Sequence, residues 1–349
     1  MSNSESLSKR IVWIDYAKAF AITIVVLLHV QIPNPYQHIF YSFVIPLFFF
    51  LAGLFSHPDH YKSFADFWKH KTLRLLVPYI FFSVLNYLYW LLVARHMGAD
   101  AEIAVSLTKP LLGILLGEAP WMLHCKPLWF LPCLMVSEII FYATYRLLPK
   151  KKVLLAIGCM AWASIGYICS YLSLPPLPYS FGGACSMLVF YYGGFWCYTK
   201  KDKFVETSRR CSVWGLCVGV IILSVLCYIV SMQVPETTRV SQNVYGNLLY
   251  AFPAAIFGGC AVICFAILLE RIVYIKTLAY IGAHTLPILA LHLIVAGWIK
   301  GITTYVFRLP LDIYDDLWAK LLLGIVVVIA CIPCCYLYDK IEKYLLVYH

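Results

Sequence analysis

The stretch "IVWIDYAKAFAITIVVLLHV", residues 11–30, is almost entirely apolar, yet it carries Asp15, Lys18 and His29. A membrane-spanning helix needs about 20 mostly apolar residues, so this stretch is long enough to cross a bilayer. At a rise of about 1.5 Å per residue, His29 lies about 16 Å beyond Lys18 along such a helix. If Lys18 marks the cytoplasmic interface, His29 is near the bilayer midplane, where an ionisable side chain is by default a hypothesis about function.

The rest of the chain has the same apolar character. Of its 349 residues, 62% are hydrophobic and 13% are charged, which is more apolar surface than one soluble core of this size could enclose. The sequence therefore predicts an all-α polytopic membrane protein, in contact with membrane lipid, that forms one domain over residues 1–349. Ten spans are expected, at about 11–30, 38–56, 74–94, 127–148, 153–173, 183–199, 211–232, 247–269, 277–300 and 317–338.

The distribution of Lys and Arg predicts the orientation of these spans. Nineteen of these residues fall in the termini and the loops on one side, and seven fall in the loops on the other. Because basic loops stay in the cytoplasm, both termini are expected to be cytoplasmic. The same count argues against an eleventh span at 104–117, which would invert every later loop. This segment is interpreted as part of an outer loop or as a re-entrant segment.

Other simple classes of function receive little support. The inward basic loops account for the net charge of +10, so no nucleic-acid partner is expected. The cluster "HPDH", residues 57–60, is a single short loop motif, and no metal site is predicted from it. The start of the chain is polar and the first apolar run carries charges, so no removed signal peptide is expected.

Ionisable side chains recur inside several predicted spans. Each is costly within a membrane unless it has a partner, and partners are most readily found where such groups face one another. Proline also recurs inside the spans, which suits a bundle built around a polar cavity, although ordinary kinks give the same pattern. Such ionisable groups are Asp15, Lys18, His29, Glu138, His284 and His292.

Five blocks of sequence together resemble the acyltransferase-3 membrane O-acyltransferases, and most closely the fucose 4-O-acetylase-like branch. Each block alone is mostly apolar, but the five occur in order and, with the last span, cover essentially the whole chain. The blocks are "WIDYAKAFAITIVVLLH" (13–29), "IFYSFVIPLFFFLAGLF" (39–55), "KTLRLLVPYIFF" (71–82), "LWFLPCLMVSEIIFY" (128–142) and "LAYIGAHTLPILALHLIV" (278–295).

The resemblance implies particular site residues. A basic residue and an essential histidine, separated by ten residues, correspond to Lys18 and His29. An Arg-x-x-Arg pattern corresponds to Lys71-x-x-Arg74, in which Lys replaces the first Arg and lacks its bidentate fork. Relatives often carry Phe-His-Met-Pro in the second block, whereas residues 43–46 are "FVIP", so any role of that histidine is absent here.

The resemblance also implies an activity: transfer of an acetyl or other short acyl group from cytoplasmic acyl-CoA to a hydroxyl of an extracytoplasmic or lipid-linked glycan, in the bacterial cytoplasmic membrane. His29 would act as general base with a carboxylate partner, either Glu138 or, through bending, Asp15, although a covalent acyl-histidine is an alternative. Lys18, Lys71 and Arg74 would bind the phosphates of acetyl-CoA. The acceptor would meet Trp129 and His292, together with Trp121 and His124 in an outer loop at 97–126.

Two other classes of function remain open at this stage. A secondary transporter for a small polar or anionic solute would also have ionisable groups in its spans, but transporters usually show related halves, and no internal repeat is evident. A structural or flippase-like protein of envelope assembly is the second alternative. Acyl transfer that is lost in a His29 variant would separate the enzyme from both.

Overall fold

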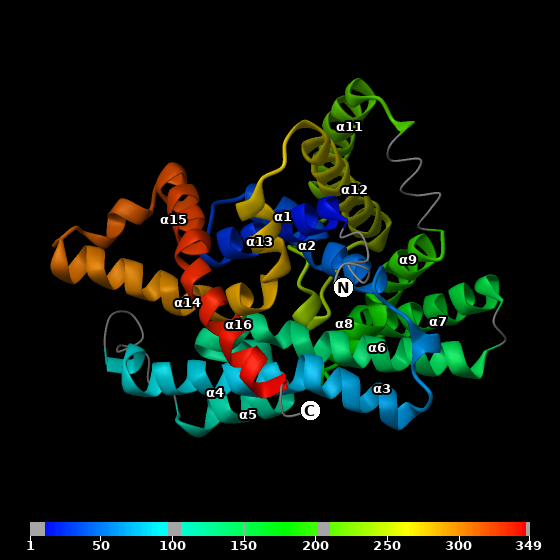
Figure 1. Cartoon of the computed structure of the whole chain (residues 1–349), viewed down its shortest axis with the longest axis horizontal. Helices are drawn as coiled ribbons and strands as arrows, with labels where there is room; N and C mark the ends of the chain where they lie inside the picture. The colour runs from blue at the N-terminus through cyan, green and yellow to red at the C-terminus, as the bar shows by residue number, and fades with distance from the viewer. Residues whose placement is uncertain (1–10, 97–105, 149–150, 201–209, 347–349) are drawn as a thin grey trace, which may run out of the picture.

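The computed structural model describes residues 11–96, 106–148, 151–200 and 210–346 (Figure 1). Within them the regular structure is helical, and nine segments are long and apolar enough to cross a membrane. The helices are α1 (Val12–His29), α2 (Tyr36–Gly53), α3 (Phe64–Lys71), α4 (Val77–Leu92), α5 (Thr108–Leu116), α6 (Phe130–Leu147), α7 (Lys152–Tyr171), α8 (Phe181–Ser186), α9 (Leu188–Tyr198), α11 (Val213–Ser231), α12 (Leu248–Ile272), α13 (Lys276–Ala283), α14 (Thr285–Gly301), α15 (Leu317–Ala330) and α16 (Ile332–Leu346). The prediction of an all-helical, multi-pass membrane protein is confirmed at this level.

The predicted span at 183–199 differs from the others because it is broken. It consists of α8 and α9, which meet at Met187, and neither part alone has the length of a span. This break is the reason that nine rather than ten segments in the described part of the chain qualify as candidate spans. The exact number of crossings and the cytoplasmic position of both termini remain predictions.

The predicted span at 277–300 is also divided. Helix α13 ends at Ala283, His284 leaves the helical conformation, and α14 begins at Thr285. Pro287 lies in the first turn of α14, where the missing backbone N–H costs little because that turn has no intrahelical acceptor for it. A sequence with uniform apolar character thus contains a sharp change of direction at a histidine.

The segment that the charge count excludes as an eleventh span contains the short helix α5. It has nine residues, which is too few to cross a bilayer. Two tyrosines of α4 bond to this segment, since the Tyr87 hydroxyl donates to the carbonyl oxygen of Leu107 and the Tyr79 hydroxyl donates to that of Ile114. The segment therefore runs back along α4 for about two turns, and its interpretation as part of an outer loop or as a re-entrant segment stays a prediction.

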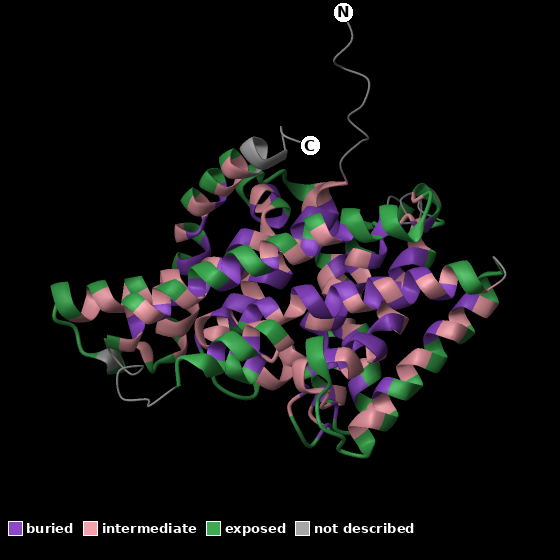
Figure 2. Cartoon of the chain, turned by 90° about the horizontal axis from the view of Figure 1, so that it is seen from below, coloured by how far each residue is buried: buried purple, intermediate pink, exposed green. Residues whose placement is uncertain are grey.

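Helix α1 lies at the centre of the bundle. It contacts α2, α12, α13, α14 and α15, and most of its residues are buried. Figure 2 shows buried residues gathered in the middle of the molecule and exposed residues on the outlying helices. Helices α7 and α11 are mostly exposed although they are strongly apolar, as is expected of surfaces that face lipid.

Gly282 allows α13 to approach α1 closely. A Cβ atom at this position would overlap the carbonyl oxygen of Asp15. Because both contacting parts are helical backbone, Gly282→Ala must push the two helices apart, and we expect a loss of about 1–3 kcal/mol in the free energy of unfolding. Thermal unfolding in detergent checks this, with Gly219→Ala as control because a Cβ there meets nothing within 4 Å. Equal melting temperatures for the two variants would contradict the tight contact.

Candidate functional site

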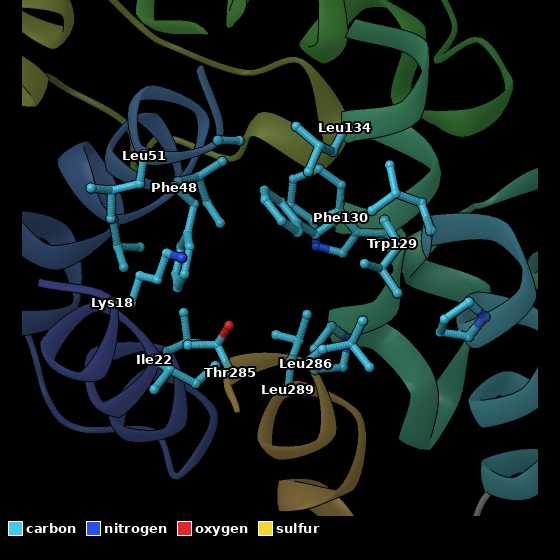
Figure 3. Close-up of a pocket in the computed structure, with 18 of the residues that line it drawn as sticks. Lys18, Ile22, Phe48, Leu51, Trp129, Phe130, Leu134, Thr285, Leu286 and Leu289 are labelled. Carbon is cyan, nitrogen blue, oxygen red and sulfur yellow. The ribbon is translucent and has the colours of Figure 1, made fainter. Parts of the chain in front are cut away.

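A cavity of about 670 Å³ lies among the central helices. Figure 3 shows side chains of four helices around the opening: Lys18 and Ile22 of α1, Phe48 and Leu51 of α2, Phe130 and Leu134 of α6, and Thr285, Leu286 and Leu289 of α14, with Trp129 just before α6. The segment 238–242, which is predicted to lie outside, and the last helix, α16, add further lining residues. The size is within the usual range of about 300–1,000 Å³ for small-molecule sites.

Two histidines from separate helices meet behind the wall of this cavity. His29 is the last residue of α1 and lines the cavity, whereas the predicted site residue His292 is a buried residue of α14 that does not line it. Their ring centroids are 4.9 Å apart with the rings edge to face. The structure therefore brings together two imidazoles that the sequence places 263 positions apart.

Backbone hydrogen bonds orient both rings in the same way. Nδ1 of His29 lies 2.7 Å from the carbonyl oxygen of Val25, and Nδ1 of His292 lies 3.0 Å from that of Ile288. A carbonyl oxygen only accepts, so each Nδ1 donates, and in the neutral ring Nε2 then carries the free lone pair. Nε2 of His292 has no hydrogen-bond partner among the described residues. A neutral His29 is thus held in the tautomer that can take a proton at Nε2.

A buried ion pair forms a second polar cluster in the cavity wall. Nζ of Lys71 lies 2.9 Å from Oε1 of Glu138, and both side chains are buried. The hydroxyl of Tyr191 donates to the same carboxylate oxygen at 3.3 Å. Oε2 of Glu138 has no hydrogen-bond partner in the described part of the chain. Lys71 is therefore already paired, and one oxygen of its partner remains available to a ligand.

Arg74 lies beside this pair but differs from it in exposure. It belongs to a π-helical turn, Thr72–Leu76, which joins α3 to α4, and π-helical turns occur frequently at functional sites. Its side chain is exposed, lines the cavity, and makes no hydrogen bond or ion pair with another described residue. Arg74 is thus the guanidinium most available to an anionic ligand at this part of the cavity.

Lys18 and a histidine–aspartate pair add charge to the cavity lining. Nζ of Lys18 lies 4.4 Å from the ring centroid of Phe55. Nε2 of His284 lies 2.9 Å from Oδ1 of Asp339, and Nδ1 lies 2.7 Å from the carbonyl oxygen of Tyr280. Both of these partners of His284 are hydrogen-bond acceptors. This pair joins the junction of α13 and α14 to α16.

The cavity lining also includes residues from the loops predicted to lie outside. Lys126 and Arg239 belong to this group, with Ala119 and Pro120 of the segment that follows α5. Lys18, Lys71 and Arg74 belong to the side predicted to be cytoplasmic and line the same cavity. The cavity thus extends between two groups of cationic residues, with His29 in its wall.

Nearly the whole chain matches one known protein family. A family model described as an acyltransferase domain, the acyltransferase-3 family, matches residues 11–339, which is nearly the whole chain. The chain belongs to this family. No curated protein and no solved structure gives a significant match. The membership identifies a multi-pass membrane acyltransferase, whereas the fucose 4-O-acetylase-like branch stays a prediction.

The remaining predicted site residues of this acyltransferase have different positions. Trp129 lines the cavity, as Figure 3 shows. Trp121 is partly exposed and lies under Lys109, and His124 packs edge to face on Tyr89. Trp121 and His124 do not line the cavity, although other residues of the same segment do. Residues 97–105 of the predicted acceptor loop lie outside the described residues.

The two carboxylates proposed as partners of His29 do not contact it. Helix α1 is continuous from Val12 to His29, so Asp15 lies about 21 Å from His29 along the axis, and bending does not join them. Asp15 is buried against α13 instead. The carboxylate of Glu138 is paired with Lys71. The alternative in which bending brings Asp15 to His29 is therefore contradicted by the continuous helix, and the backbone oxygen of Val25 orients the ring.

Three charged residues that line the main cavity could not be recognised as such from the sequence. Lys126 and Arg239 stand out there only as charges of outer loops, and Asp339 does not stand out at all. For Lys126 a weak signal exists, because it lies three positions before the predicted site residue Trp129. Arg239 and Asp339 have no such neighbour in sequence, so only the folded chain shows that they line the cavity.

The histidine-rich loop at 57–60 belongs to the described part of the chain. Among the described residues no cluster of three or more metal-binding side chains is present. His57 and His60 stack on each other within the loop, with ring centroids 5.1 Å apart.

Proposed function

We propose that this acyltransferase moves an acetyl group, or another short acyl group, from cytoplasmic acyl-CoA to a hydroxyl of an extracytoplasmic or lipid-linked glycan in the bacterial inner membrane. One observation carries the proposal: His29, held with Nε2 as acceptor, lines a cavity that cationic residues border on both predicted sides. The cationic groups suit the phosphates of CoA on one side and an acceptor from the other.

The chemistry follows from the tautomer of His29. An alcohol is a weak nucleophile at neutral pH, so Nε2 of His29 removes its proton as the oxygen attacks the thioester carbonyl. The tetrahedral intermediate then collapses, and the CoA thiolate leaves and takes the proton from the imidazolium. His292, whose ring packs edge to face against that of His29, helps to keep the His29 ring in place. The alternative is attack by Nε2 itself to form an acyl-histidine, which the alcohol then cleaves.

Reconstitution of the purified protein tests this function. Proteoliposomes receive radiolabelled acetyl-CoA on one side and a glycan acceptor on the other, and we expect label in the acceptor together with release of free CoA. Hydrolysis of acetyl-CoA without acceptor is the minimal activity expected. Uptake of a small solute with no acyl transfer and no release of CoA would instead support the secondary transporter.

The assignment of the donor site predicts a selective effect at Arg74. A planar guanidinium can make two hydrogen bonds to one phosphate, and lysine cannot reproduce both. We expect Arg74→Lys to raise the KM for acetyl-CoA about tenfold and Arg74→Ala to raise it more, with a smaller change in the KM for the acceptor. Arg271→Lys is the control, since Arg271 bonds to the backbone of Cys211 and does not line the cavity. An unchanged donor KM in both Arg74 variants would leave Arg74 only an anchoring role.

A further inference from the structure

A second cavity, of about 310 Å³, lies next to the first. Its walls come from α2, α7, the α8–α9 pair, α12 and the outer segment that precedes α12. Among the described residues that line it none is charged, and most are apolar, such as Met160, Phe190, Phe252 and Ala255. Its volume lies at the lower end of the range for ligand sites, so it is large enough for part of a hydrocarbon chain.

This second cavity borders the surface that faces lipid. Met160 and Ile168 of α7 are each 53% exposed, and Phe252 of α12 is 38% exposed. In a membrane-spanning chain such apolar surfaces contact hydrocarbon. A chain can therefore reach the cavity sideways from the bilayer, without crossing a polar layer.

The two cavities share a wall. Thr238 lines both of them, and the next residue, Arg239, lines the main cavity. On α2, Tyr41 lines the main cavity and Ser42 the second. A molecule with its chain in the second cavity can thus place its head group where the two cavities adjoin, next to Arg239.

Most N–H donors of the Arg239 guanidinium make no hydrogen bond within the described residues. A guanidinium has five N–H donors, and within the described residues its side chain makes one hydrogen bond, from an Nη atom to Oε1 of Gln242 at 3.3 Å. An exposed guanidinium with free donors beside an uncharged, apolar cavity is complementary to an amphiphile with an anionic head. Phosphate is the head group whose geometry matches a guanidinium best.

We propose that the second cavity binds the hydrocarbon chain of a lipid phosphate acceptor, with the phosphate at Arg239 and the glycan hydroxyl directed toward His29. The inference rests on the proposed function, because it names the class of acceptor for the same site. Of the two acceptor classes implied above, it favours the lipid-linked glycan over a free surface polysaccharide. Tyr245, which is buried and lines this cavity, keeps a hydroxyl that has no hydrogen-bond partner in the described part of the chain and can bond to an ester or phosphate oxygen of such a lipid.

Photolabelling with a farnesyl phosphate that carries a diazirine at the far end of its chain tests this binding directly. We expect label in peptides of α7 and α12. Unlabelled farnesyl phosphate should compete, whereas farnesol, inorganic phosphate and phosphatidylglycerol vesicles should compete much less. Equal competition by phosphatidylglycerol would show an ordinary lipid crevice and overturn the proposal, as would competition by inorganic phosphate alone.

Substitutions that fill the second cavity provide a second test of the proposal. Each buried methylene contributes about fourfold in affinity, so Ala255→Phe, which displaces several, should weaken labelling at least about tenfold. Ala163→Phe fills the cavity from α7 and replaces the first variant if that one does not fold. Ile256→Phe is the matched control, because Ile256 neighbours Ala255, is 42% exposed and lines neither cavity. Equal labelling in the filled and control variants overturns the proposal.

Arg239→Gln tests the contribution of the phosphate head group to binding separately from that of the hydrocarbon chain. It should abolish the advantage of farnesyl phosphate over farnesol and leave the weak binding of farnesol unchanged. Because labelling requires no turnover, selective labelling without acetyl transfer would count against the proposed function alone. Normal acetyl transfer with unselective labelling would count against this inference alone.

Discussion

Replacing His29 with alanine will reduce the turnover number for acyl transfer about 10²- to 10⁴-fold, which is the usual loss when a general base is removed. The loss follows from geometry, because Nδ1 of His29 is engaged by the carbonyl of Val25 and Nε2 is the atom that can take the proton. The measurement is release of CoA by purified protein at saturating acetyl-CoA. Expression and membrane insertion should not change, because a half-buried ring at the end of α1 is replaced by a good helix former.

His38→Ala is the matched control for this experiment. His38 is also a histidine, in the first turn of α2, but its ring bonds to the carbonyl oxygen of Ser231 and lies near the hydroxyl of Thr237. It does not line the main cavity. We expect turnover close to that of the unaltered protein. Near-normal turnover in well-folded His29→Ala protein would remove His29 from the catalytic step.

The same variant separates direct transfer from a covalent acyl-histidine. Acetyl-CoA is mixed with the protein in the absence of acceptor, and the peptide that contains His29 is examined by mass spectrometry after rapid acid quench. A mass increase of one acetyl group on that peptide, absent in His29→Ala, indicates the covalent route. Its absence, together with acetylated acceptor on addition of glycan, indicates general-base catalysis.

Replacing Lys71 with methionine will lower the free energy of unfolding by about 3–5 kcal/mol, because it leaves the buried carboxylate of Glu138 without its ion-pair partner. Methionine has a similar length, so little of the loss comes from an altered volume. The free cysteines allow a direct measurement: buried thiols such as Cys125, Cys133 and Cys159 react with a maleimide dye only as the protein unfolds. Cys211 is exposed and supplies a constant background.

The double variant Lys71→Met, Glu138→Leu is the control for this pair. Removal of both partners leaves no unpaired charge, so most of the lost stability should return. Arg74 is unchanged in the double variant, and so a donor KM close to normal would show that the pair only supports the wall. A single Lys71→Met variant as stable as the original protein would contradict a structural role for the ion pair.

The sequence by itself determined that this protein is a helical, multi-pass membrane protein of the acyltransferase-3 family. A run of about 20 apolar residues identifies a span because, as a helix, it matches the thickness of the bilayer core and satisfies its own backbone hydrogen bonds there. Such a run can be recognised from local composition alone. The five ordered blocks predict the family, which the family match confirms. His29 could be singled out for the same local reason, since an ionisable ring in an apolar run is costly unless it serves a purpose.

Only the tertiary structure decided how these residues meet. The breaks at Met187 and His284 are invisible in apolar sequence, because composition records hydrophobicity and not the direction of a helix. The contact of His29 with His292 and the pairing of Lys71 with Glu138 join helices far apart in the chain, and such pairs depend on packing that one sequence does not reveal. Asp15, the carboxylate that sequence placed on the same helix as His29, is held away from it by the rigid rise of that helix, so a backbone carbonyl orients the ring instead.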